Sequence, residues 1–140
     1  MIVINPDKYI RAAYATALAT YAPVWEKKVP INVSIPPLYY LISTQTKNET
    51  ERRKCGYEWM CSITIECVSI QQQGMASSVA INDLEENLLS VVASEIQVAG
   101  FDVKDTFFID SVSLDVDTPT NSIYRRVVTY QHWLNQLTTT

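Results

Sequence analysis

The chain has 140 residues, of which 47% are hydrophobic and 19% are charged, and its formal net charge is −4. This length predicts a single domain, residues 1–140, which can bury enough surface to fold without a disulfide or a metal. The excess of acidic residues argues against a protein that binds nucleic acid tightly. We expect no membrane span, because the chain lacks a long apolar run. We also expect no secretion signal, because the N-terminus lacks a basic region followed by an apolar stretch.

The first element is predicted to be a helix. Asn5 suits the N-cap, Pro6 the first helical position, and Asp7 the positive end of the helix dipole. Residues 8–21 are rich in alanine, contain no glycine or proline, and repeat apolar side chains at helical spacing. Pro23 is expected to end this helix.

Extended segments are predicted next. Residues 24–26 have the pattern of a brief strand, and residues 38–44 that of a strand with aromatic and β-branched side chains. The polar residues 45–54 predict a loop that is too long for a tight turn. Residues 57–70 give the clearest strand, because their side chains alternate. Its apolar face is formed by Tyr57, Trp59, Cys61, Ile63, Ile65 and Cys67.

Apolar residues recur at helical spacing across residues 77–96, which predicts a second helix. Ser77 or Ser78 can cap its start, and the acidic residues of its first turns are favoured there by the helix dipole. Gly100 is expected to stop it.

Two further strands are predicted over residues 106–116 and 122–134, joined by a turn at residues 118–121. The strands of the chain are connected mainly as hairpins. The predicted fold class is therefore α+β, with a mostly antiparallel sheet of about four to five strands and two helices packed on one of its faces.

Cysteine and histidine do not form a recognisable reactive site in the sequence. Cys55, Cys61 and Cys67 are an odd set, and the last two stand about 20 Å apart on one predicted strand, so free thiols are expected. His132 is the only histidine, and its place in a strand favours a structural role, although a pair with Cys61 or Cys67 stays open. No metal site and no cofactor are predicted.

Three acidic residues offer a second pattern that could support catalysis. Asp110, Asp115 and Asp117 could hold a divalent cation for hydrolysis. Their alternation with serines is, however, typical of a solvated strand face. The chain is therefore predicted not to be an enzyme. Hydrolytic activity that is lost in a folded Asp115→Ala variant would instead support the alternative of a minimal hydrolase.

Eight tyrosines and three tryptophans are many for this length, and they suit either a tyrosine-rich core or a protein interface. The charged segment 46–54 is either a solvated loop or a projecting segment that pairs with a neighbouring subunit. Its candidate interface residues are Lys47, Glu49, Glu51, Arg52, Arg53 and Lys54.

The order of elements resembles the small tail-terminator, tail-completion and head–tail joining proteins of tailed bacteriophages. Those proteins begin with an alanine-rich helix and continue with a proline-preceded strand like residues 37–42. They then carry a polar loop like residues 46–56, a long amphipathic strand like residues 57–70, a second helix like residues 77–96, and a terminal strand pair. The resemblance covers nearly the whole chain.

This resemblance implies a structural virion protein in a homo-oligomeric ring, six- or twelve-fold, at the neck or the tail end, assembled in the host cytoplasm. Portal or adaptor and tail proteins would be its partners. DNA would pass through the channel without sequence-specific binding, since an acidic lumen does not hold it back. Segment 46–54 would reach a neighbouring subunit or line the channel. The helix-free face of the sheet, with Tyr124 and Tyr130 or their opposite neighbours, would pack between subunits.

A second class of protein also fits the sequence. A small non-enzymatic binding or assembly-chaperone module would act as a monomer or a dimer. Native mass distinguishes it from a ring subunit, which should form a high symmetric oligomer or join one on a partner.

Overall fold

The computed structural model describes residues 3–53, 56–72 and 77–137 as two helices and a six-stranded sheet. In chain order the elements are α1 (Pro6–Leu18), β1 (Val24–Glu26), β2 (Leu38–Arg53), β3 (Gly56–Gln72), α2 (Val79–Ala93), β4 (Phe101–Ser113), β5 (Val116–Asp117) and β6 (Asn121–Gln136). The strands lie in the order β1–β2–β3–β6–β4, and β5 also pairs with β6. β1 and β2 are parallel, and the other described pairings are antiparallel, which confirms the predicted fold class.

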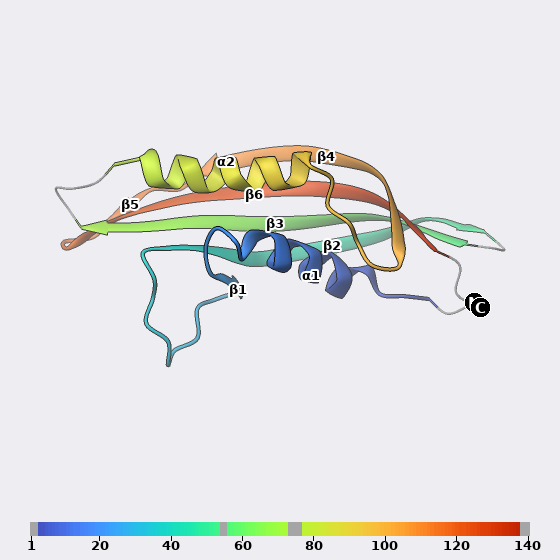
Figure 1. The fold of residues 1–140 in the computed structure, drawn as a ribbon, viewed down its shortest axis with the longest axis horizontal. Helices are drawn as coiled ribbons and strands as arrows, with labels where there is room; N and C mark the ends of the chain where they lie inside the picture. Colours follow the sequence, from blue (N-terminus) through green and yellow to red (C-terminus); the bar gives the residue numbers. More distant parts are fainter. Residues whose placement is uncertain (1–2, 54–55, 73–76, 138–140) are drawn as a thin grey trace.

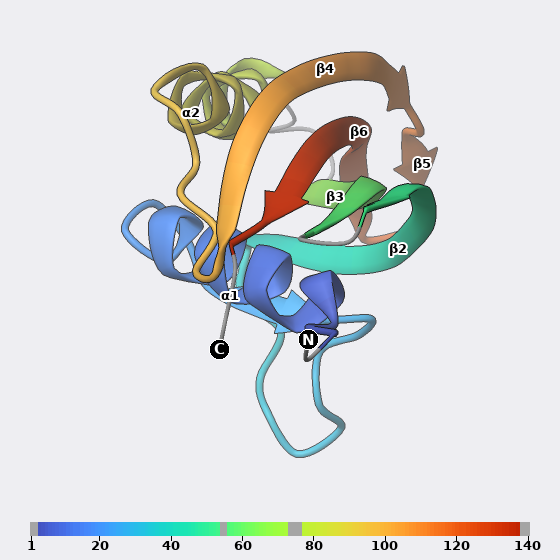
Figure 2. The same cartoon turned by 90° about the vertical axis from the view of Figure 1, so that its right-hand side faces the viewer.

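Both helices cover one face of an elongated, curved sheet, as predicted (Figure 1, Figure 2). The main core lies between the helices and this face, where alternating positions of β3 meet an apolar stripe of each helix. Its central members are Ile10, Tyr14 and Leu18 from α1, Ile81, Leu84, Leu88 and Val92 from α2, and Cys61, Ile63, Ile65 and Cys67 from β3. Neither helix of the described chain is long and apolar enough to cross a bilayer.

α1 begins where the sequence predicts, but it ends earlier than predicted. The Asn5 side chain accepts a hydrogen bond from the backbone N–H of Asp7 at 3.1 Å, which is the predicted cap. The helix ends at Leu18, before the boundary expected at Pro23. The chain turns there because β1 must reach β2, and the N–H of Tyr40 donates to the carbonyl of Pro23 at 2.9 Å.

The prediction of a polar loop at residues 45–54 is wrong for the part that the structure describes. Residues 45–53 continue β2, and the pairing with β3 runs on to Arg53 opposite Gly56. Register shifts after Ile42 and after Glu49 mark two bulges in this ribbon. This ribbon extends past the helix-covered core, and the pairing of its backbone with β3 stabilises it. Residues 45–53 therefore need no apolar alternation, which is the signal that would have predicted a strand from the sequence. Lys54 lies outside the described residues.

The opposite face of the sheet carries a smaller buried cluster near β1. Tyr39, Leu41 and Val68 form it. Trp25, Val29, Ile70 and Ile123 pack against it. The segment that follows β1 therefore covers part of the helix-free face.

The end of α2 also differs from its prediction. The helix ends at Ala93, so Gly100 is not its stop. Glu95 instead takes the left-handed backbone conformation just past the helix, with φ of 65°, and its N–H donates to the carbonyl of Val92 at 3.1 Å. Gly100, with φ of 82°, lies in the turn before β4, which begins earlier than expected, at Phe101.

Glu95→Gly should increase the free energy of unfolding by about 1 kcal/mol, because glycine adopts the left-handed conformation without the steric cost of a Cβ atom. Denaturant titration of the two proteins measures the difference. Glu95→Ala is the matched control, since it removes the carboxylate and keeps the Cβ. A glycine variant no more stable than the alanine variant would show that the backbone carries no strain here.

Candidate interaction surface

β4 forms an edge of the sheet, and the outer side of its backbone pairs with no other described strand. Six large apolar side chains, in the second half of β4 and in the residues that follow it, are between 39% and 57% exposed. They are Phe107, Phe108, Ile109, Val112, Leu114 and Val116. A long, exposed apolar edge is a surface onto which another chain can pack or add a strand.

The exposed side chains of β4 point to both faces of the sheet. Phe108 lies opposite Tyr130 on the helix-covered face, with ring centroids 5.7 Å apart in an edge-to-face arrangement. Phe107 lies opposite Gln131 on the helix-free face. Register shifts after Val103 and after Phe108 mark bulges, which increase the local twist of a strand, and β4 curves strongly in Figure 2.

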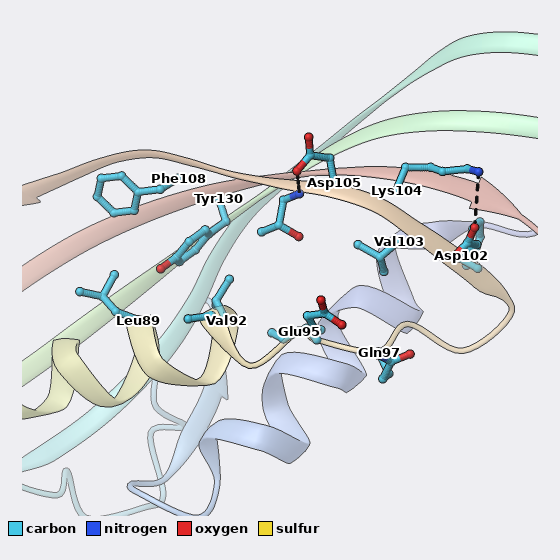
Figure 3. A pocket seen from close by; sticks show the side chains of 14 residues that line it. Leu89, Val92, Glu95, Gln97, Asp102, Val103, Lys104, Asp105, Phe108 and Tyr130 are labelled. Atoms are coloured by element: carbon cyan, nitrogen blue, oxygen red, sulfur yellow. Dashed lines mark hydrogen bonds and ion pairs between the residues drawn. The ribbon is translucent and has the colours of Figure 1, made fainter.

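On the helix-covered side, a groove of about 620 Å³ lies between α2 and β4 (Figure 3). Leu89, Val92 and Phe108 contribute apolar side chains to it. Burial raises the pKa of Tyr130, which also lines the groove, to about 12, so its phenol stays protonated and neutral. The groove can therefore hold an apolar side chain, and this phenol does not act as a base near neutral pH.

β4 and β5 carry a marked negative charge. Residues 101–117 contain five aspartates and one lysine. Lys104 pairs with Asp102 at 3.5 Å, and Arg126 with Asp115 at 2.9 Å. Asp105 and Asp110 are exposed and form no ion pair with any described residue, and in Figure 3 the Asp105 carboxylate points away from the groove. The Asp105 carboxylate accepts a hydrogen bond from the backbone N–H of Thr106 at 2.8 Å. The edge thus presents two carboxylates without an ion pair beside apolar side chains.

The three aspartates of the hydrolase hypothesis do not come together. Asp115 is held by Arg126, and Asp117 accepts a hydrogen bond from the Ser122 hydroxyl at 2.8 Å. No group of three or more His, Cys, Asp or Glu side chains in the described ranges could hold a metal ion. The geometry gives Asp110 no metal-binding partners there.

Most of the charged candidates at residues 47–54 lie on the β2–β3 ribbon. Lys47 forms an ion pair with Asp7 at 2.7 Å, which ties β2 to the start of α1. Glu49 lies opposite Trp59, and the backbone of residues 51–53 continues the strand. Their contact with a neighbouring subunit stays a proposal.

The prediction that Tyr124 and Tyr130 lie on the helix-free face is wrong. Tyr130 is 4% exposed within the main core, and Tyr124 packs against that core. The alternative prediction placed the residues next to these tyrosines on the helix-free face. Arg125 does lie there, and it pairs with Glu66 at 3.0 Å. The signal was present in the sequence, because Tyr124, Val128 and Tyr130 share one apolar face of the strand and such a face is the one that helices cover.

His132 is buried in a hydrogen-bonded network and is not poised for catalysis. Its Nε2 lies 2.6 Å from the Tyr14 hydroxyl, and its Nδ1 lies 3.0 Å from the Thr106 hydroxyl. Burial lowers the pKa of the imidazole to about 4. Cys61 is its cross-strand partner, but burial raises the pKa of that thiol to about 12, and that of Cys67 also rises. The cysteine–histidine pair therefore offers neither a thiolate nor a free base.

Comparison with known proteins gives a fold relationship. No protein-family model and no curated protein matches the sequence. A chain from the virion of a native gene transfer agent particle shares the fold, with a TM-score of 0.58 and 13% identity over 92% of this chain and 90% of that one. A second solved protein, which carries no functional name, has a TM-score of 0.53 and 14% identity over 96% and 98% of the two chains. The described elements thus form a fold that recurs over nearly the full length of both proteins.

Stability should fall as the pH falls from about 6.5 to about 4, because the unfolded His132 takes up a proton in this window and the buried, folded one does not. The loss should be on the order of 3 kcal/mol across the window. Denaturant titrations near neutral pH and near pH 4.5 should show a smaller loss in His132→Gln than in the wild type. Equal losses in the two proteins would contradict this assignment.

Cys61 and Cys67 should resist alkylation in the folded chain. Both are buried with raised thiol pKa values, and the thiolate is the reactive form. Iodoacetamide at mildly alkaline pH, followed by peptide mapping, should leave both unmodified until denaturant is added. Rapid modification of either thiol in a protein whose circular dichroism is unchanged would show that the core opens locally.

Proposed function

We propose that this chain is a structural protein of a virion or phage-like particle and acts as a subunit of a homo-oligomeric ring. The observation that carries the proposal is the fold shared with a gene transfer agent virion protein over about nine-tenths of each chain. The order of elements that resembles tail-terminator and head–tail joining proteins supports the same role. The place proposed for the ring is the neck or the tail end.

The surface of the chain supports assembly. A soluble monomer rarely leaves a row of large apolar side chains exposed along an open strand edge, because such an edge invites pairing. β4 has this character between Phe107 and Val112. A partner subunit on β4 would remove these side chains from water and pair the outer backbone groups.

The charge of the chain suits a ring around DNA. With a net charge of −4 the subunit does not attract the phosphate backbone. A channel of like charge lets DNA pass without sequence-specific binding. Portal or adaptor and tail proteins would bind above and below the ring. The charged residues Glu51, Arg52, Arg53 and Lys54 are proposed to contact one of these neighbours or the next subunit.

The groove between α2 and β4 favours one alternative. Its apolar side chains could accept a peptide side chain, as in a small binding or assembly-chaperone module. Such a module would act as a monomer or a dimer. The oligomeric state therefore separates the two functions.

The purified chain should form a symmetric six- or twelve-fold ring, alone at high concentration or on a neck or tail partner, because β4 is left open in the single copy. Native mass spectrometry across a concentration series and negative-stain images measure this. Any portal, adaptor or tail protein encoded beside this chain serves as a template in the same assay. A protein that remains monomeric or dimeric at every concentration and with every partner would contradict the ring and favour the binding module.

A further inference from the structure

A second group of exposed apolar side chains lies at the other edge of the sheet. Residues 27–37, here called the arm, connect β1 to β2 and project beyond the β2 side of the molecule (Figure 2). Ile31 is 95% exposed, and Val33 and Ile35 are also exposed. Three branched apolar side chains held in water are a contact surface without an intramolecular partner.

The backbone of the arm is also available for pairing. Apolar Ile31, Val33 and Ile35 alternate with Asn32 and Ser34, which is the period of a strand. The N–H of Val33 donates to the carbonyl of Pro30 at 3.1 Å, which closes a turn at Ile31 and Asn32 that has to open before the segment can pair as a strand. The other four N–H groups of residues 31–35 donate to no acceptor in the described chain. Flanking prolines at 30, 36 and 37 limit any strand here to about five residues.

The charges of the arm complement those of β4. The arm contains Lys27 and Lys28 and no acidic residue, and both lysines are exposed without an ion pair to any described residue. The β4 edge offers the exposed carboxylates of Asp105 and Asp110, which form no ion pair with a described residue. Oppositely charged groups beside apolar ones fix the register of a contact and disfavour wrong partners.

The two surfaces lie on one face of the sheet but at opposite edges. Val29 at the base of the arm packs on the small cluster of the helix-free face. Asp105 lies opposite Trp133, and Asp110 opposite Thr129, on that same face. β3 and β6 separate β2 from β4 within one molecule. This placement allows the arm of one copy to meet the β4 edge of a neighbouring copy in the same orientation.

A symmetric contact between two β4 edges is disfavoured by the same charges. It would bring Asp105 and Asp110 of one copy toward the carboxylates of the other, and like charges placed face to face cost free energy. An arm on β4 is a contact between two different surfaces, and this type of contact forms a ring where the rotation between neighbours closes and an open filament where it does not.

We propose that the arm of one copy adds as a short strand to the free edge of β4 in the next copy, with Lys27 and Lys28 beside Asp105 and Asp110. This inference rests on the proposed ring function and names the contact that builds the ring. Ile31, Val33 or Ile35 would then cover the exposed apolar side chains of β4 on the helix-free face.

Charge reversal at each surface tests the contact. Lys27→Glu with Lys28→Glu (the arm variant) and Asp105→Lys with Asp110→Lys (the edge variant) should each raise the concentration for half-assembly by about tenfold or more. The chain carrying all four changes should recover assembly. The control combines Lys8→Glu with Asp83→Lys, exposed helix positions that make one reversal of each type away from both surfaces and, like the chain with all four changes, keep the net charge, and it should assemble like the wild type. Analytical ultracentrifugation measures assembly, and circular dichroism verifies the fold of each variant.

Mixing distinguishes a head-to-tail contact from a two-fold one. Each copy of the arm variant keeps an intact β4 edge, and each copy of the edge variant keeps an intact arm. In an equimolar mixture the intact arm of one variant meets the intact edge of the other, and the reversed arm meets the reversed edge, so the mixture should recover an assembly in which the two variants alternate, detectable by native mass spectrometry. A mixture that stops at a 1:1 heterodimer would indicate a two-fold contact between β4 edges and would overturn this inference. An arm variant that assembles as well as the wild type would overturn this inference and leave the ring standing, whereas a wild-type chain that never assembles would overturn both proposals.

Discussion

The burial of one face of β3 beneath both helices determines where the other side chains of the sheet point. Cys61, Ile63, Ile65 and Cys67 are wholly buried on this face, and the alternation of a strand then sends their neighbours to the other side. β2 and β6 pair with β3 on its two sides, and paired residues point to the same face of the sheet. The register of each pairing therefore determines which side chains of β2 and β6 face the helices. Tyr130 enters the core for this reason, and Arg125 faces the helix-free side.

The same arrangement leaves β4 incompletely covered. α2 packs on β3 and β6 and reaches β4 through few contacts, such as the hydrogen bond from the Ser111 hydroxyl to Glu85 at 2.7 Å. Phe108 borders a groove instead of a filled core. Apolar surface that a third helix would cover in a self-contained domain stays in water, and its removal from water is the available driving force for association.

The elements whose apolar side chains repeat at a regular spacing could be predicted from the sequence. The elements that depend on contacts with other parts of the chain could not. The cap at Asn5, the alternation of β3 and the apolar stripe of α2 are local signals, and each proved correct. The continuation of β2 through a polar segment depends on backbone pairing with β3, which leaves no pattern in β2 itself. The exposure of Val112 and Leu114 was equally hidden, since an alternating strand has the same sequence whether or not a layer covers it. The candidate surface at β4 therefore needed the three-dimensional arrangement.

The direction of the proposed ring follows from an asymmetry along the sheet. One edge carries lysines on a proline-bounded arm, and the other carries carboxylates on a long strand, so each copy has a distinct head and tail. A head-to-tail contact closes into a ring only if each copy turns by a fixed angle relative to the last. The bulges of β4 twist the edge that receives the arm. In the proposed ring the number of subunits is therefore set by the twist of β4 relative to β2, while the charges and apolar side chains set only how tightly neighbours bind.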